Sequence, residues 1–179
     1  MTVEAKVPAG FAEVTRDGDR GSVRFERRLS TSLADAWSVV TEPERIARWF
    51  APVAVEGKEW VTYWDGDERE YAKGEILRCE PERLIEVSWQ ASDDAAPFAD
   101  TVLRVTLEPG EGGVLLILEH EQLLAADLTQ YGPGWHTYLD RLPDGDPGLD
   151  WSARYAELKP YYEESFRASS GRGDDGLSA

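Results

Sequence analysis

The hydrophobic period of the chain is two over a long stretch, from residue 53 to residue 123. Trp60, Thr62 and Trp64, for example, fall on one face of an expected strand. Further strands are expected at residues 70–80, 84–90, 101–108 and 114–123. Parallel neighbours need long crossover connections, whereas the breaks between these strands are short. The pattern therefore predicts an antiparallel meander.

One strand and two short helices are expected before the meander. The strand covers residues 22–30, where apolar side chains alternate. Ser32 can cap a first helix, in which residues 33–40 carry an apolar stripe at helical spacing. Thr41 and Glu44 match the capping-box pattern of a second helix, with Pro43 tolerated in its first turn.

The chain is expected to end in helix. Residues 131–142 and 151–166 carry apolar stripes at helical spacing, and the loop 143–148 separates them. Pro160 is expected to kink or split the second segment.

A single domain is expected over residues 22–167. Residues 1–21 form an N-terminal extension, which can hold a short extra strand at residues 11–15. Residues 168–179 are polar and close to free of large apolar side chains, so we expect a flexible tail.

Four motifs occur in an order that is familiar. Residues 41–52, Thr-Glu-Pro-Glu-Arg-Ile-Ala-Arg-Trp-Phe-Ala-Pro, are similar to a T-x-P-x-x-[IL]-x-x-W-[FW]-x-P signature. Paired strands flank Pro81-Glu82-Arg83-Leu84, a strand follows Gly112-Gly113, and Gly134-Trp135 opens a helix. In these motifs the chain resembles the activator of Hsp90 ATPase homologue (AHSA1-like) family. That family is part of the SRPBCC superfamily, also described as START-like or Bet v 1-like. The loop at residues 144–150 and the acidic charge depart from the family pattern.

The resemblance implies an α+β helix-grip fold. In such a fold a curved antiparallel sheet wraps around a long C-terminal helix, and two short helices follow the first strand. The fold encloses an apolar cavity between the sheet and the helix. Relatives include co-chaperone domains, lipid carriers and polyketide cyclases, so fold analogy alone does not decide the function.

Seven tryptophans are many for 179 residues, and several are candidates for the cavity wall. Trp60 and Trp89 from the sheet, with Trp49 and Trp135 from helices, are expected to line it. Tyr138 shares the helical stripe of Trp135 and is a further candidate ligand-binding residue. Aromatic walls bury large areas and suit flat or hydrophobic ligands. The alternative for each ring is plain core packing.

Three polar residues need separate interpretations. His120 is in phase with the apolar face of the last strand, where it can be a ligand anchor, an acid or base, or a core histidine with its hydrogen bonds satisfied. Arg27 also falls on an apolar face; we expect it to pair with Glu75 or Glu119, or to meet an anionic ligand. His136 is off the Trp135 stripe and is expected to face solvent.

The formal net charge of -16 disfavours phosphate backbones and anionic lipid, so neither nucleic acid nor a membrane is an expected partner. Solubility is the simplest reason for such charge, and a basic protein or a cationic ligand is the alternative. The N-terminus lacks the pattern of a signal peptide and Cys79 is the single cysteine, so the expected location is cytoplasmic.

No cofactor or metal is expected. The chain has no Gly-rich phosphate loop, no nucleophile elbow and too few His and Cys residues for a zinc site. Asp93 and Asp94 are interpreted as loop acids. Nothing in the sequence demands an enzyme. Three hypotheses follow: a small-molecule binding protein, a cyclase- or hydrolase-like enzyme using His120, and a protein-partner module like the Hsp90 activators.

Overall fold

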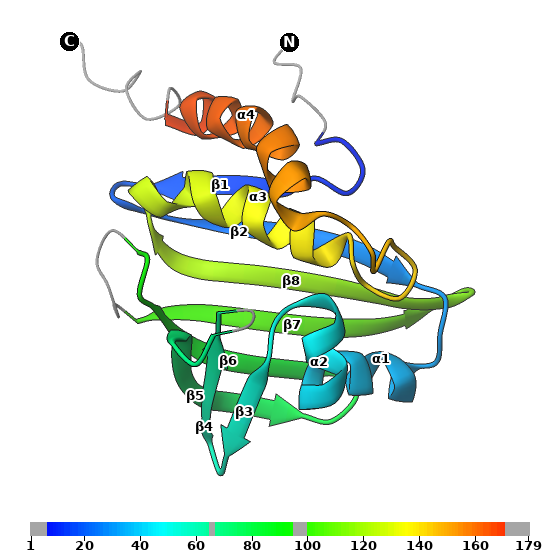
Figure 1. The fold of residues 1–179 in the computed structure, drawn as a ribbon. Helices are drawn as coiled ribbons and strands as arrows, with labels where there is room; N and C mark the ends of the chain where they lie inside the picture. Colours follow the sequence, from blue (N-terminus) through cyan, green and yellow to red (C-terminus); the bar gives the residue numbers. More distant parts are fainter. Residues whose placement is uncertain (1–6, 65–66, 95–99, 171–179) are drawn as a thin grey trace, which may run out of the picture.

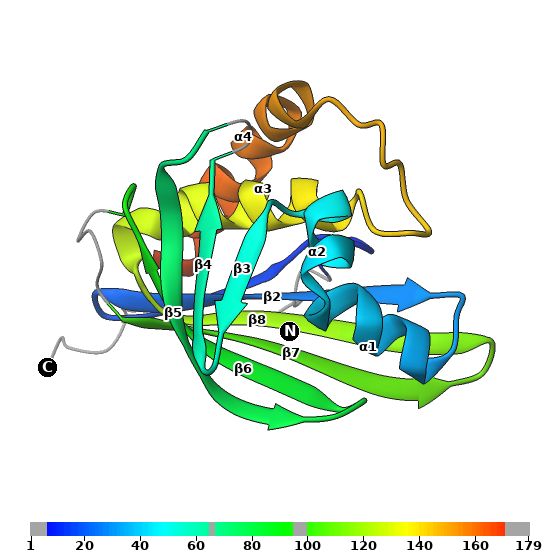
Figure 2. The same cartoon turned by 60° about the horizontal axis from the view of Figure 1, so that its bottom comes forward.

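A computed structural model describes residues 7–64, 67–94 and 100–170 of the chain. Eight antiparallel strands form one curved sheet in the order β1-β2-β8-β7-β6-β5-β4-β3 (Figures 1 and 2). The strands are β1 (Glu13–Asp17), β2 (Arg20–Leu29), β3 (Val53–Glu56), β4 (Glu59–Tyr63), β5 (Glu70–Glu80), β6 (Leu84–Ala91), β7 (Thr101–Gly110) and β8 (Gly113–Leu124). From β3 to β8 each strand pairs with the next, which confirms the predicted meander.

The helices lie on the concave side of this sheet. They are α1 (Leu33–Thr41), α2 (Pro43–Trp49), the short 3-10 turn η1 (Ala125–Asp127), α3 (Leu128–Leu139) and α4 (Trp151–Ser170). Figure 1 shows α3 across the sheet, with α4 packed behind it and beside β1. The α+β helix-grip fold is thus confirmed, with α3 as the helix that faces the sheet. α4 runs through Pro160 as one helix, and it includes residues 168–170, which were expected to belong to the tail.

The junction of α1 and α2 is set by a cap and a proline. Ser32 accepts a hydrogen bond from the Asp35 backbone N–H, which confirms the predicted cap of α1. The predicted capping box of α2 is wrong. Thr41 is the last residue of α1, and its hydroxyl donates to the Trp37 carbonyl. Pro43 disfavours helical geometry in the residue before it, so the extended residue Glu42 becomes the N-cap of α2.

β5 passes very close to β6 at Gly74. A Cβ atom on Gly74 would lie 1.9 Å from the Ser88 carbonyl oxygen, so only glycine fits there. The same carbonyl accepts a hydrogen bond from Trp60 Nε1 at 3.1 Å, and Ser88 Oγ accepts one from the Glu75 backbone N–H at 2.8 Å. Figure 2 shows the arrangement of these strands: β3, β4 and β5 stand upright against the strands that lie across the bottom of the view.

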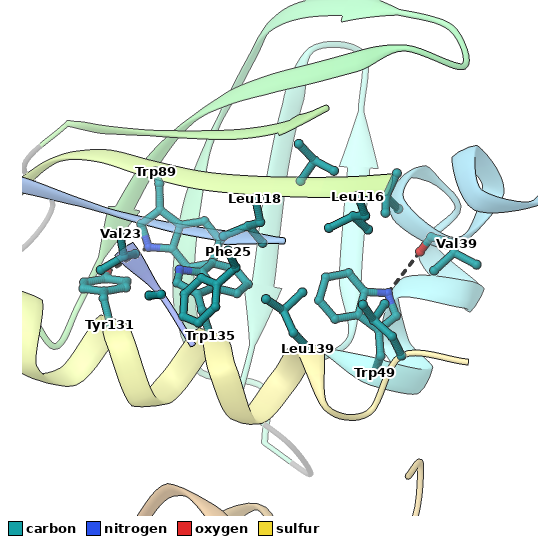
Figure 3. Close-up of a cluster of buried hydrophobic side chains, with 14 of the residues drawn as sticks. Val23, Phe25, Val39, Trp49, Trp89, Leu116, Leu118, Tyr131, Trp135 and Leu139 are labelled. Carbon is teal, nitrogen blue, oxygen red and sulfur yellow. Dashed lines mark hydrogen bonds between the residues drawn. The ribbon is translucent and has the colours of Figure 1, made fainter. Parts of the chain in front are cut away.

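The core fills the space between α3 and the strands β2 and β8. Tyr131, Trp135 and Leu139 follow one another at a spacing of four and project from α3 toward the sheet (Figure 3). Phe25 and Leu118 face them from β2 and β8. In the described part of the chain, no helix is both long enough and apolar enough to cross a membrane.

Candidate functional site

A pocket of about 380 Å³, here called the apolar compartment, lies between the helices α1 and α2 and the bent sheet. Its lining consists of Trp37, Val40, Thr41, Pro43, Ile46, Trp49, Phe50, Val53, Val55, Trp60, Ile76, Cys79, Ile85, Val87, Trp89, Leu103, Val105, Leu118 and Trp135. The volume is within the range of about 300–1,000 Å³ that is usual for ligand pockets. Four of the predicted site residues, Trp49, Trp60, Trp89 and Trp135, come together here.

The indole N–H groups of these four tryptophans are all used inside the protein. The acceptors are the Val39 carbonyl for Trp49 (3.0 Å), the Ser88 carbonyl for Trp60 (3.1 Å), the Tyr131 hydroxyl for Trp89 (3.0 Å) and His120 Nδ1 for Trp135 (3.1 Å). Figure 3 shows the first of these bonds, between Trp49 and Val39. The rings are therefore fixed in orientation, and they present carbon rather than a hydrogen-bond donor to the compartment.

His120 lies behind the wall made by Trp89 and Trp135 and is fully buried. An indole N–H can only donate, so Nδ1 of His120 accepts from Trp135 and Nε2 carries the proton. Nε2 then donates to Thr101 Oγ1 at 2.7 Å, and Thr101 donates to the Trp89 carbonyl at 2.9 Å. Burial lowers the pKa of His120 to about 3, so the imidazole is neutral. Both ring nitrogens are engaged by protein groups.

A second pocket of about 290 Å³, here called the aromatic pocket, lies on the other side of three shared rings. Phe50, Trp89 and Trp135 line both spaces, and their ring centroids are 5.4–5.9 Å apart. These rings form a divider. The rest of the aromatic pocket is lined by Trp64, Tyr71, Asp93, Gln130, Tyr131, Gly134, Tyr138, Trp151 and Tyr155. Tyr138, a predicted site residue, is thus in this pocket and not in the apolar compartment.

A buried carboxyl group lies beside the aromatic pocket. Tyr131 donates its hydroxyl proton to Asp94 Oδ1 at 2.7 Å and accepts from Trp89 Nε1. Burial raises the pKa of Asp94 to about 6, the Tyr131 hydrogen bond lowers it, and the nearby Asp127 and Asp93 add to the rise. Asp94 was expected to be an ordinary loop acid, but it is buried. The loop after β6 packs against α3, and this long-range contact covers the Asp94 side chain.

Arg27 lies apart from the tryptophans, under the C-terminal end of α3. It donates to the Gly10 carbonyl at 2.7 Å, and its guanidinium is 3.3 Å from Asp140. The predicted partners were wrong: Glu119 is near Arg24 and Arg104 instead. The strand register explains why Arg27 pairs with Asp140. Arg27 is opposite Leu116 and points to the concave face of the sheet, where Asp140 at the end of α3 contacts it.

His136 is also buried, which corrects the expectation that it faces solvent. Its Nδ1 is 2.7 Å from the Tyr162 hydroxyl of α4, and Phe11 covers it edge-on. Burial lowers the pKa of His136 to about 4, although Asp140 nearby raises it. The apolar stripe of α3 predicts burial only for the face that packs on the sheet. The opposite face, which carries His136, is buried by α4.

No group of three or more His, Cys, Asp or Glu side chains in the described ranges is placed to hold a metal ion. Most of the other lining residues were not among the predicted site residues. Of these, Phe50 lines both pockets and Tyr131 lines the aromatic pocket, and Asp94 accepts a hydrogen bond from Tyr131. Phe50 is in the T-x-P signature and Tyr131 is on the stripe of α3, so both carried a sequence signal. Asp94 carried none.

Comparison with known proteins identifies the family. The family described as "Activator of Hsp90 ATPase homolog 1-like protein" matches residues 30–144, more than half of the chain. No curated protein sequence matches. The crystal structure of CalU16 from Micromonospora echinospora is 26% identical, with a TM-score of 0.70 over 87% of this chain and 97% of CalU16.

Two further structures share the fold at lower identity. EF2215 from Enterococcus faecalis, a conserved protein of unknown function, is 18% identical, with a TM-score of 0.69 over 88% of this chain and 91% of its own. An Hsp90 activator from Plasmodium falciparum is 15% identical, with a TM-score of 0.57 over 67% of this chain and 91% of its own. The fold, the motifs and the family match agree, and the chain belongs to the activator of Hsp90 ATPase homologue family of the SRPBCC superfamily.

Proposed function

We propose that the protein binds a small, apolar, ring-containing molecule in the apolar compartment. The observation that carries this proposal is the composition of the lining: six of its 19 residues are aromatic, and only Thr41 and Cys79 bear a hydroxyl or thiol. The Thr41 hydroxyl already donates to the Trp37 carbonyl. A ligand there gains mainly from leaving water and from contact with ring faces.

Catalysis has less support from the same geometry. Cyclase- or hydrolase-like chemistry needs an acid or base within hydrogen-bond reach of the substrate. The lining of the apolar compartment contains no Asp, Glu, His, Lys or Arg. His120, the acid or base in the enzyme hypothesis, is behind the tryptophan wall with both nitrogens engaged. The arrangement favours a binding protein over an enzyme.

A neutral apolar dye tests the proposal. N-phenyl-1-naphthylamine gains fluorescence when it leaves water, and it should bind the wild-type protein saturably. Ile76→Trp puts an indole into the compartment, and it should weaken dye binding at least tenfold. Leu77→Trp is the matched control, because Leu77 is the next residue of β5 and is 51% exposed. Equal dye binding by the two variants, both checked for folding by melting temperature, would refute the proposed site.

Cys79 gives an independent readout. It is the single cysteine of the chain, it is exposed, and it lines the apolar compartment. A molecule bound there should slow the reaction of Cys79 with a thiol reagent such as iodoacetamide. Dye that binds without protecting Cys79 would place the binding elsewhere and count against the proposal.

A further inference from the structure

The aromatic pocket is separated from the apolar compartment and differs from it in chemistry. Nine of its twelve lining residues are aromatic. They come from the strands β5 and β6 and the helices α3 and α4, with Trp64 directly after β4 and Phe50 at the end of α2. Phe50, Trp89 and Trp135 form the divider between the two spaces. A ligand in one space therefore need not occupy the other.

The rings follow one another around the aromatic pocket in contact. Trp64 and Tyr71 meet with centroids 4.5 Å apart, and Tyr71 meets the divider at Trp89. On the other side, Tyr138 meets Trp151 at 5.4 Å, and Trp151 stacks on Tyr155 at 4.9 Å. The faces of such rings carry partial negative charge, and several faces around one space attract a cation.

Full negative charge is added at the same place. Asp93 lines the pocket and is exposed at its rim, and Asp94 is buried beside it. Both carboxyl groups reach the pocket electrostatically: burial raises the pKa of the Tyr71 phenol most, and Tyr138, Asp94 and Asp93 raise it further. None of the described residues that line the pocket is Lys or Arg.

The N-terminus of α4 begins at Trp151, and a helix N-terminus carries partial positive charge. The Asp150 carboxylate partly neutralises that charge, because its Oδ1 accepts a hydrogen bond from the Ala153 backbone N–H at 2.9 Å. Asp150 therefore offsets part of the positive charge at this end of the pocket.

From this geometry we propose that the aromatic pocket binds a small organic ammonium ion, with the alkylated nitrogen among the rings and near Asp93. The volume of about 290 Å³ is at the lower end of the usual range for ligand pockets, which fits a small molecule. Trp151 Nε1 is buried and has no hydrogen-bond acceptor among the described residues. An ammonium ligand with a neighbouring oxygen can supply one.

Choline and its neutral isostere 3,3-dimethylbutan-1-ol provide the test, because they have nearly the same shape and differ in the charge. Titration of the full chain by calorimetry or tryptophan fluorescence should show choline binding at least tenfold more tightly. Equal affinities for the two compounds, or no binding of choline, would overturn the proposal.

Variants locate the site. Trp151→Leu and Tyr155→Leu each remove one ring, and each should weaken choline binding about fivefold to tenfold, the scale of a cation–π contact in a sheltered site. Using both protects the test against misfolding of either one. Asp93→Asn should also weaken choline binding, whereas Glu111→Gln should not. Glu111 is an exposed acid in the turn after β7, at the end of that strand away from Asp93. If Asp93→Asn and Glu111→Gln weakened choline binding equally, the attraction would depend on net charge alone. That result would overturn the proposed site.

The outcome is separable from that of the proposed function. Ile76→Trp should weaken dye binding to the apolar compartment at least tenfold and leave choline binding unchanged, because Ile76 lines only the former. Asp93→Asn should weaken choline binding and leave dye binding unchanged. Choline binding that is lost in Ile76→Trp would show that the two ligands share one space, and it would overturn the second site.

Discussion

The indole N–H of Trp135 donates to Nδ1 of His120 at 3.1 Å, and this one bond fixes the tautomer of a fully buried imidazole. The helix that faces the sheet is thereby tied to β8, and through Thr101 to β7 and the Trp89 carbonyl on β6. We interpret His120 as the polar centre of the core.

His120→Leu should lower the free energy of unfolding by about 2–4 kcal/mol. The change leaves the Trp135 N–H buried without its acceptor, and an orphaned buried donor costs about 1–3 kcal/mol before any loss of packing. Chemical denaturation at pH 7.5 measures the loss. A variant as stable as the wild type would show that the bond contributes nothing.

The same variant should change how stability depends on pH. The pKa of His120 is about 3 in the folded chain and near the ordinary 6.5 when unfolded. Below pH 6.5 the unfolded state therefore binds a proton that the folded state refuses, so stability falls as the pH drops from 6.5 toward 3. The variant lacks this contribution. Its stability curve between pH 4 and 6 should be shallower than that of the wild type by about 1.4 kcal/mol per pH unit.

Asp94→Asn should stabilise the protein at pH 8. A carboxyl group whose folded pKa is raised to about 6 from 3.8 binds its proton more tightly when folded. Its cost to stability is therefore absent below pH 4, grows between pH 4 and pH 6, and is complete above pH 6. The difference amounts to at most about 3 kcal/mol, at about 1.4 kcal/mol per pKa unit. Asparagine can still accept from Tyr131. Thermal unfolding at pH 8 and pH 4 should show a gain only at pH 8, and Asp93→Asn, at the exposed rim, should show little gain at either.

Gly74→Ala should destabilise the domain by at least about 2–4 kcal/mol, in the range of severe steric substitutions. The added Cβ atom would meet the Ser88 carbonyl, which is fixed by the ladder and by Trp60. Gly110→Ala is the control, because no atom lies within 4 Å of a Cβ atom there. Its effect should stay within about 0.5 kcal/mol. Similar unfolding midpoints for both variants would contradict the need for glycine where β5 approaches β6.

Tyr162→Phe should loosen the contact between α4 and the start of the chain. The Tyr162 hydroxyl accepts from the Ala12 backbone N–H at 3.0 Å and contacts His136 Nδ1 at 2.7 Å. Its loss leaves a buried backbone donor unpaired, at a cost of about 1–3 kcal/mol. Hydrogen exchange at the Ala12 amide should accelerate. Tyr161→Phe, the neighbouring substitution, should leave that amide protected.

The elements of the fold could be predicted from the sequence because their signals are local. The alternation in residues 70–80 is that of β5 over the same bounds, and the Ser32 cap depends on a residue three positions away. The prediction that Thr41 caps α2 was wrong because two local signals competed. The backbone restriction that Pro43 places on Glu42 outweighed the capping pattern.

The sites could be predicted only in part, because they depend on what packs over each residue. Periodicity indicated which tryptophans face inward, but it could not show that the ring of Phe50 divides the interior into two spaces. His136 and Asp94 are polar residues that elements distant in sequence cover, α4 for the first and α3 for the second. The partner of Arg27 depended on where α3 ends over β2.

The outermost strands of the sheet, β1 and β3, are only five and four residues long. Unpaired strand edges recruit other chains, and short edge strands limit that recruitment. β1 in particular shields the ten-residue β2, so shortening the chain past residue 19 would bare a long ladder of unpaired backbone groups. The expected consequence is association of separate molecules edge to edge, before any loss of the ring-lined interior.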